Sequence, residues 1–371
     1  MRKVAVLTFC DSFNYGAALQ AYATFVFLTD MGFECKFIDY RNKNEKKLYD
    51  CFSFISSSSI VNNIKRTIKN SILCGHKNGS AGFSLFYSKL PKTKSYNERN
   101  IVKFDEKENF DYVVIGSDQV WNPDICAGKI DLIFFGNFTK KKKISFASSC
   151  GSYEYSDEEW NLIKPLLSEF SSISVREEFA RTQLINKGLQ KKISILLDPT
   201  LLICEKQWNR LINEKVADNI IPKEDYIVVY FVAKKYDSCE EYIKYLAEKY
   251  ESKVIFINIY NIRKKYVDYY FRKITPFDFI NLIAHAKGII TDSFHAIVYS
   301  IIYKREFYYL NNNNPKRVEG LLSLLQIKQR TVNNINDIKR LSDEPINYSE
   351  VDKFLQEQRE MAEEYVKKEF T

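Results

Sequence analysis

The sequence contains few of the residues from which metal and redox sites are built. Its 371 residues include three histidines, His76, His285 and His295. The eight cysteines are scattered, with no CxxC pair and no spacing typical of metal ligands. In a chain of this size such cysteines are more often reduced than bridged. We therefore expect no metal, no redox cofactor and a cytoplasmic location.

Long apolar runs and targeting segments are missing too. No run reaches the ~18 residues that a membrane-spanning helix needs. Residues 1–9 carry two charges beside an apolar stretch too short for a signal peptide, so we interpret them as a first buried strand. No recognised nucleic-acid-binding motif occurs, so nucleic acid is not an expected partner. A hydrophobic content of 45% excludes global disorder, and the length favours two domains.

The net charge of +8 is unevenly distributed. Residues 41–103 hold thirteen lysines and arginines against three acidic residues, a local excess of ten positive charges. The ordinary interpretation of this basic segment, 41–105, is a solvated surface. The alternative is a surface for an anionic partner, such as phospholipid head groups or a pyrophosphate-linked substrate.

Short apolar runs alternate with longer amphipathic stretches along the chain. Fully apolar runs such as 112–115 and 226–232 are typical of strands covered on both faces in a parallel sheet. The alternation predicts an α/β fold with two doubly wound, Rossmann-like domains facing a cleft. We place an amino-terminal domain at 1–212 and a carboxy-terminal domain at 213–345. A final helix at 346–371 is expected to pack back across both.

The most informative motif is TDSFHA, residues 291–296, directly after the apolar run 288–290. Ser293 is a good N-cap candidate, which would place His295 in the first turn of a helix. Free backbone N–H groups and the positive end of the helix dipole suit an anionic ligand there. A histidine against a bound anion can donate a proton. The alternative is a partly buried histidine with a structural partner.

Two motifs at predicted strand ends suggest a sugar-binding side. In SFNYGAALQ, residues 12–20, Gly16 and Ala17 allow a helix to start close to a ligand, and Asn14 is the polar candidate. In GSDQVWNP, residues 116–123, Asp118 is placed to accept a proton from a sugar hydroxyl and Trp121 to stack on a sugar face. The alternatives are a plain strand–helix turn, a capping Asp118 and a Trp121 in the core.

Two further strand ends offer a thiol and a cation. In ASSCG, residues 147–151, Cys150 suggests a nucleophile, but no histidine is predicted near it, so a structural role is favoured. Arg176, in SVREE at 174–178, suits a carboxylate or phosphate, with a structural salt bridge as an equal alternative. Lys304, Arg317 and Arg330 add cations after His295, although each alone is more often surface.

Together, in order, these motifs resemble the polysaccharide pyruvyl transferase family. The matching segments are NYGAALQ (14–20), GSDQVWNP (116–123), SVRE (174–177), LDPTLL (197–202) and TDSFH (291–295), followed by Arg317 and Arg330. Some members have glycine where this chain has Ala296. Some have arginine where this chain has Ser293, which leaves open the cation that holds the donor phosphate.

The resemblance implies a fold related to GT-B glycosyltransferases. It also implies transfer of the pyruvyl group of phosphoenolpyruvate onto two hydroxyls of a sugar, in a cell-surface or capsular polysaccharide precursor, with release of phosphate. The implied roles are catalytic for His295 and Asp118, and acceptor-binding for Asn14 and Trp121. The donor would be bound by residues from both predicted domains: Arg176, Ser293, Lys304, Arg317 and Arg330.

Three functions therefore remain to be distinguished. The first is this pyruvyl transferase. Its acceptors would include lipid-pyrophosphate-linked oligosaccharides, and the basic segment would contact the anionic inner face of the cell membrane. The second is a GT-B type glycosyltransferase that uses a nucleotide sugar. The third is a non-catalytic sugar-binding protein on the same scaffold, which fold analogy alone does not exclude.

Overall fold

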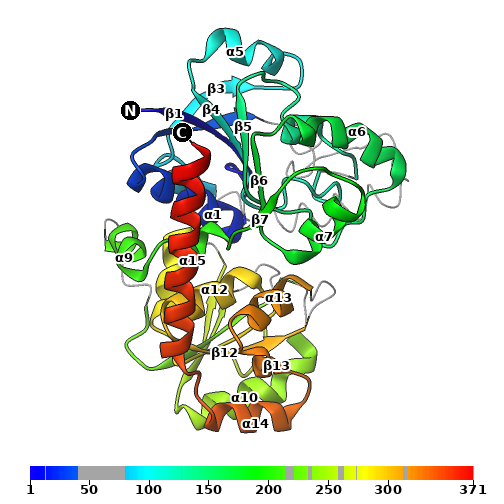
Figure 1. Cartoon of the computed structure of the whole chain (residues 1–371). Helices are drawn as coiled ribbons and strands as arrows, with labels where there is room; N and C mark the ends of the chain where they lie inside the picture. Colours follow the sequence, from blue (N-terminus) through cyan, green and yellow to red (C-terminus); the bar gives the residue numbers. More distant parts are fainter. Residues whose placement is uncertain are drawn as a thin grey trace, which may run out of the picture. The chain divides into compact units, whose positions relative to one another are not determined.

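The computed structural model describes residues 1–12, 14–40, 80–126, 128–213, 221–232, 236–257, 263–272, 274–311 and 316–370. These residues form two compact units (Figure 1). The first unit takes the described residues of Met1–Cys74, Tyr87–Ile203 and Glu357–Thr371. The second takes those of Gly75–Phe86 and Cys204–Gln356.

The first unit is built on a seven-stranded sheet in which every pairing is parallel. Its strand order is β3-β2-β1-β4-β5-β6-β7. In chain order the strands are β1 (Lys3–Leu7), β2 (Glu34–Tyr40), β3 (Lys92–Tyr96), β4 (Tyr112–Ile115), β5 (Lys142–Ser148), β6 (Ser172–Val175) and β7 (Ile193–Ile195).

Both faces of this sheet are covered, which explains the apolar strands. All four residues of β4 are buried. Val113 and Ile115 point into a core formed with α6 (Asp157–Ser168) and α7 (Glu178–Asn186), which lie beside β5 to β7 in Figure 1. On the other face Phe27 of α1 (Tyr15–Asp30) stacks on Phe146 of β5 at 5.6 Å between ring centroids. Parallel strands covered by helices lose the polar alternation of half-exposed strands.

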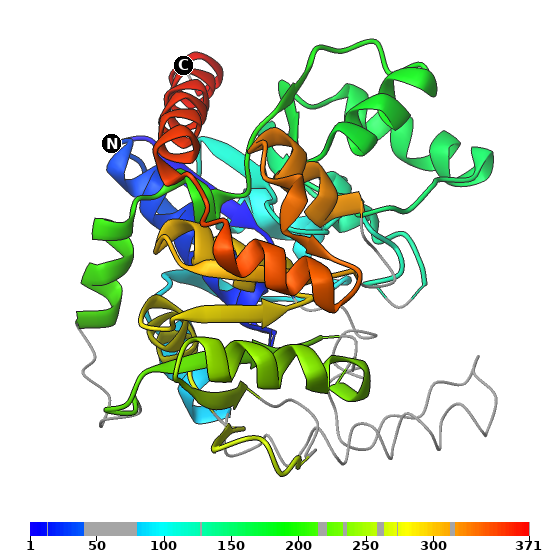
Figure 2. The ribbon, with the colours of Figure 1, turned by 90° about the horizontal axis from the view of Figure 1, so that it is seen from below.

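The second unit repeats this architecture with six parallel strands in the order β10-β9-β8-β11-β12-β13. They are β8 (Tyr226–Tyr230), β9 (Lys253–Ile257), β10 (Tyr269–Phe271), β11 (Gly288–Thr291), β12 (Glu306–Leu310) and β13 (Thr331–Val332). Apolar residues of α10 (Glu240–Lys249) and α14 (Ile335–Asp343) join one core with β8 and β9. Figure 2 shows these two helices side by side, in contact with each other.

The other helices are short, apart from the last. They are α4 (Ser80–Tyr87), α5 (Phe104–Lys107), α8 (Pro199–Leu202), α9 (Glu205–Asn213), α11 (Pro276–Ala284), α12 (Phe294–Ile302), α13 (Lys316–Leu324) and α15 (Tyr348–Glu369), with 3₁₀ turns at Ile101–Lys103, Leu132–Phe135, Tyr236–Cys239 and Lys328–Arg330. Within the second unit, Tyr348 of α15 donates to the Arg305 carbonyl. Within the first, Tyr365 of α15 donates to the Ser145 carbonyl.

The two parallel α/β sheets confirm the predicted fold class. Strands β3, β10 and β13 were not predicted. They are short strands at the edges of the sheets, and edge strands tend to be short or charged rather than apolar. The sequence of β3, KTKSY, is an example: it lacks the apolar run from which a strand is predicted. Strand β7 ends at Ile195, because the chain then turns into α8, where Asp198 accepts a hydrogen bond from the Thr200 backbone N–H.

Most of the predicted basic segment, residues 41–79, lies outside the described residues. Its remaining part contains α4, β3 and the 3₁₀ turn Ile101–Lys103. Of the helices that the structure describes, none combines the length and apolar character needed to cross a membrane.

Arg330 links several elements of the second unit from a buried position. Its side chain donates to the carbonyls of Phe307 at 3.0 Å, Leu341 at 3.2 Å and Glu344 at 3.1 Å. It also binds the Glu306 carboxylate at 2.7 Å, and 1% of its side chain is exposed. The guanidinium therefore joins the start of β12 to the end of α14.

Replacing Arg330 is expected to destabilise the protein. Arg330→Met leaves three carbonyls and a carboxylate without their donor, and breaking such a buried pair costs about 3–5 kcal/mol. The matched control is Arg340→Met on α14, whose pair with Glu344 is exposed and is worth roughly 0–1 kcal/mol. Urea unfolding followed by circular dichroism measures both; equal stabilities would contradict the linking role of Arg330.

Gly116, directly after β4, is expected to resist substitution. Its φ is +108°, and an added Cβ would lie 2.5 Å from the Phe146 carbonyl oxygen. Gly116→Ala therefore combines backbone strain with a clash against the neighbouring strand and should cost more than about 1–3 kcal/mol. In α13, Gly320→Ala meets open space and should stabilise by about 0.5–1 kcal/mol. Opposite changes in melting temperature are expected; a tolerated Gly116→Ala would refute the steric argument.

Candidate functional site

The predicted strand-end motifs lie at the carboxyl edges of the two sheets. Strands β1, β4, β5 and β6 are consecutive in the first sheet, and each is followed by one of the motifs. The TDSFH motif follows β11, next to β8, in the second sheet. In open parallel sheets ligands bind outside the carboxyl ends of strands.

Hydroxyl groups tie the strand ends of the first unit together. Thr8 donates to the Ser117 carbonyl at 2.8 Å, and Ser117 Oγ donates to the Ala147 carbonyl at 3.0 Å. Ser148 Oγ donates back to the Ile115 carbonyl at 2.8 Å. These bonds satisfy main-chain groups that a strand leaves unpaired where it ends, so the small polar residues of the motifs hold the loops in place.

Asp118 is held by its backbone in a left-handed conformation, with φ of +71°. Its carbonyl accepts from the Ser149 N–H at 3.0 Å, which joins the loops after β4 and β5. Aspartate tolerates this conformation better than most residues. The Asp118 side chain is 12% exposed, and its carboxylate lies 3.9 Å from the Arg176 guanidinium.

Arg176 is surrounded by three carboxylates. Its guanidinium binds Asp198 at 2.5 Å and Glu177 at 2.9 Å, with Asp118 at 3.9 Å. Burial by itself would lower the pKa of Arg176, but Glu177, Asp198 and Asp118 outweigh it and raise that pKa. The arginine stays charged, and an anionic donor would have to compete with three carboxylates for it. These contacts favour the salt-bridge alternative over a donor-binding role.

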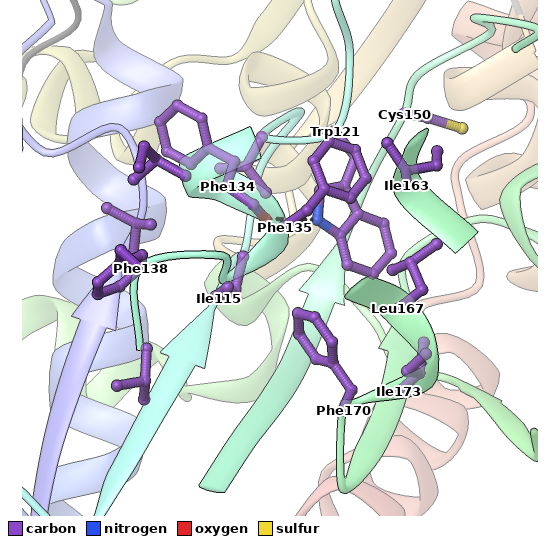
Figure 3. Close-up of a cluster of buried hydrophobic side chains, with 14 of the residues drawn as sticks. Ile115, Trp121, Phe134, Phe135, Phe138, Cys150, Ile163, Leu167, Phe170 and Ile173 are labelled. Atoms are coloured by element: carbon purple, nitrogen blue, oxygen red, sulfur yellow. Dashed lines mark hydrogen bonds between the residues drawn. The ribbon is translucent and has the colours of Figure 1, made fainter. Parts of the chain in front are cut away.

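The two predicted acceptor residues have different surroundings. Asn14 is exposed and caps α1, where its side chain accepts from the Ala17 N–H at 3.2 Å. Trp121 is 2% exposed, and its indole N–H donates to the Phe134 carbonyl at 2.8 Å. Figure 3 shows this bond and the packing of the Trp121 ring among buried side chains, including Phe135, on which it stacks at 5.7 Å. The buried ring supports the core alternative for Trp121.

Cys150 also lies in this buried cluster (Figure 3). Its side chain is 2% exposed, and burial raises the pKa of the thiol to about 12. A thiol in this state is protonated at neutral pH and inert as a nucleophile. The structure thus agrees with a structural role for Cys150. In the part of the chain that the structure describes, no group of three or more His, Cys, Asp or Glu side chains is arranged to hold a metal ion.

In the second unit, Ser293 begins α12. Its Oγ accepts from the Ala296 N–H at 3.4 Å, and its own N–H donates to Thr291 Oγ1 at 3.0 Å. Asp292 accepts from the Val232 N–H at 2.6 Å, which connects the ends of β11 and β8. His295 therefore lies in the first turn of α12, as the motif predicts, and it is 8% exposed.

Arg317, in the first turn of α13, reaches the start of α12. Its guanidinium lies 4.3 Å from the centroid of the Phe294 ring. The Phe294 ring in turn meets the His295 imidazole edge to face, at 5.1 Å between centroids. The structure thus gathers Ser293, His295 and Arg317 around Phe294. Phe294 had not been identified as a site residue, because an aromatic side chain at the first position of an apolar helix is typical of a core residue.

Lys304 and Arg330 lie away from this group. Lys304 follows the carboxyl end of α12, about 13 Å along the helix from its start, where it binds Asp352 at 2.5 Å. Arg330 binds the first residues of β12, which pair with the start of β11, the end of that strand opposite to Thr291. Both cations have partners of their own at these places.

Comparisons with known proteins agree with this architecture. Solved structures with a similar fold include a UDP-GlcNAc 2-epimerase from Neisseria meningitidis bound to UDP-GlcNAc, with a TM-score of 0.53 and 11% identity over 98% of this chain and 94% of that chain. A putative UDP-N-acetylglucosamine 2-epimerase from Listeria monocytogenes gives a TM-score of 0.52 and 12% identity over 95% and 90%. At these identities the similarity shows the fold alone, which is of the GT-B type.

No curated protein matches the sequence. The family model described as polysaccharide pyruvyl transferase matches residues 14–314. This range includes the strand-end motifs of the first unit and the start of α12 in the second. Because the match covers most of the chain, the protein belongs to the polysaccharide pyruvyl transferase family.

Proposed function

We propose that this protein transfers the pyruvyl group of phosphoenolpyruvate onto two hydroxyls of a sugar in a cell-surface polysaccharide precursor. The products are a cyclic ketal and inorganic phosphate. Family membership supports the proposal, and the observation that carries it is the placement of His295 in the first turn of α12 with Arg317 close by. A proton donor and a cation at a helix N-terminus suit a small substrate with two anionic groups.

The chemistry needs one proton at carbon. A general acid protonates the methylene carbon of phosphoenolpyruvate, which leaves an oxocarbenium-like centre at the carbon that bears the phosphate. One sugar hydroxyl adds to this centre and loses its proton. The carbon–oxygen bond to phosphate then breaks, and the second hydroxyl closes the ring with loss of its proton. No step requires a metal ion or a redox cofactor.

We assign the proton donor to His295 and donor binding to Arg317 and the backbone N–H groups that Ser293 helps to position. The imidazole lies in the first turn of α12, at the positive end of the helix dipole, and a phosphate bound there would lie within reach of both the helix start and Arg317. Asp118 and Asn14 are our acceptor-side assignments in the first unit. Asp118 is the stronger of these, since its backbone is bridged to Ser148 at the end of β5 and its carboxylate lies 3.9 Å from the Arg176 guanidinium.

Thermal unfolding with ligands tests the donor. Phosphoenolpyruvate at 100 times its Kd should add about 2.7 kcal/mol of stability and raise the melting temperature. His295→Ala and Arg317→Ala should lose most of this increase. The controls are His285→Ala at the end of α11, where its ring bonds the Asn281 carbonyl of the same helix, and Arg340→Ala on α14. Both should respond like the parent protein.

The same measurement separates the competing functions. Stabilisation by a nucleotide sugar and not by phosphoenolpyruvate would reassign the protein to glycosyl transfer. A phosphoenolpyruvate response that survives in His295→Ala and Arg317→Ala would place the donor elsewhere. A non-catalytic sugar-binding protein would keep its sugar ligand after His295→Ala and release no phosphate from phosphoenolpyruvate.

We further propose that the acceptor is linked to a lipid pyrophosphate and that the basic segment 41–105 contacts the anionic inner face of the cell membrane. The excess of ten positive charges in residues 41–103 supports this placement. Sedimentation with vesicles should show binding that rises with anionic lipid content and falls as salt rises. Charge-reversed Lys65→Glu/Arg66→Glu should bind less, and equal binding to neutral vesicles would contradict the proposal.

A further inference from the structure

Phe294 differs from the rest of the helix that it begins. The structure describes all nine residues of α12, and the other eight are buried. Phe294 is the one that remains partly exposed. Leaving an aromatic ring at the surface forfeits part of the free energy of its burial. Packing alone therefore does not explain a phenylalanine at this position.

The exposed ring carries a cation. The Arg317 guanidinium lies 4.3 Å from the ring centroid, within the ~6 Å at which a cation is attracted by the negative face of an aromatic ring. Arg317 comes from a different helix, α13, so the ring joins the starts of α12 and α13.

The position of this cation is unfavourable for the helix. The start of α12 carries the positive end of the helix dipole, which repels a guanidinium, and basic side chains are stabilising at the opposite end. An anion at this place would be attracted both by the helix start and by the guanidinium. The Phe294 ring adds an attraction that helps to hold Arg317 beside the start of α12.

We propose that Phe294 is a positioning residue for the donor anion: its ring holds the Arg317 guanidinium at the start of α12, next to His295. The inference rests on the proposed function and adds to it a residue that acts without touching the substrate. Its contacts on both sides, with Arg317 at 4.3 Å and with His295 at 5.1 Å, fix the spacing of the cation and the proton donor.

Anion binding to the full chain tests the inference. The variants are Phe294→Leu, which removes the ring but keeps an apolar side chain, and Phe294→Tyr, which keeps the ring. Dissociation constants for phosphoenolpyruvate and for inorganic phosphate are measured separately. Phe294→Leu should weaken both by about 3- to 10-fold, as the loss of a cation–π contact at a partly exposed site predicts, and Phe294→Tyr should restore them.

A double-mutant cycle separates positioning from general packing. In an Arg317→Gln background, Phe294→Leu should cause no further loss, because the ring acts through the arginine. The matched control is Phe271→Leu, a partly exposed phenylalanine at the end of β10 in the same unit, separated from β11 by two strands. This control should leave both dissociation constants unchanged.

The position of the arginine itself is read from its side-chain N–H resonance in protein labelled with ¹⁵N-arginine. The Arg317 signal, assigned by its absence in Arg317→Lys, should be shifted by the ring current in the parent protein and in Phe294→Tyr. Phe294→Leu should return it to an ordinary position. A signal that does not move between the parent and Phe294→Leu would overturn the proposed contact.

The outcomes for the two ligands distinguish this inference from the proposed function. Phosphate binding that depends on Phe294, without any phosphoenolpyruvate binding, would support the positioning role and overturn the donor assignment. Unchanged affinities in Phe294→Leu would overturn the positioning role alone. A parent protein that binds neither phosphate nor phosphoenolpyruvate would overturn both.

Discussion

Both sheets of this protein are parallel, and the polar chemistry of the chain depends on that constraint. A parallel strand covered on both faces is mostly apolar along its length. Many of the polar side chains therefore lie at the last residue of a strand or just after it, where main-chain groups need hydrogen-bonding partners. Thr291, which donates to the Tyr230 carbonyl at 2.6 Å, and Ser117, which donates to the Ala147 carbonyl, serve this need. The family motifs occupy the same positions.

Three arginines show how environment changes the use of one side chain. Arg176 meets three carboxylates, and Arg330 meets three carbonyls and one carboxylate, so both are committed to internal bonds. Arg317 lies on the face of an aromatic ring beside a helix N-terminus. The ring attracts the guanidinium and holds it near the start of α12. Of the three, Arg317 is the one that contacts the ring next to His295 at the start of α12.

The serine at position 293 fits this arrangement. As N-cap it satisfies a backbone N–H of α12, and it adds no charge to the site. Arg317, brought from α13, supplies positive charge at the same helix start. Donor recognition in this chain would thus combine two elements. The capped start of α12 is local in sequence, whereas Arg317 reaches that helix start only because α13 is placed beside it in the fold.

Local pattern was sufficient for the architecture and for part of the site. The apolar runs predicted the central strands of both sheets, and the Ser293 cap predicted that His295 lies in the first turn of a helix, because these features depend on neighbours within a few residues. Strand β3 is too polar, and β10 and β13 are too short, to be recognised in this way. Local pattern also identified Arg176, Arg317 and Arg330 as cations without distinguishing their roles.

Tertiary structure alone decided the surroundings of these side chains. The carboxylates around Arg176 come from three strand ends, Trp121 became a core residue through contacts with Phe134 and Phe135, and Arg317 reached Phe294 across 23 residues of sequence. Sequence by itself therefore determined the fold class, the family and the helix start at Ser293. The surroundings of each charged side chain arose only when the parallel sheets brought distant strand ends together, because electrostatic environment depends on neighbours in space.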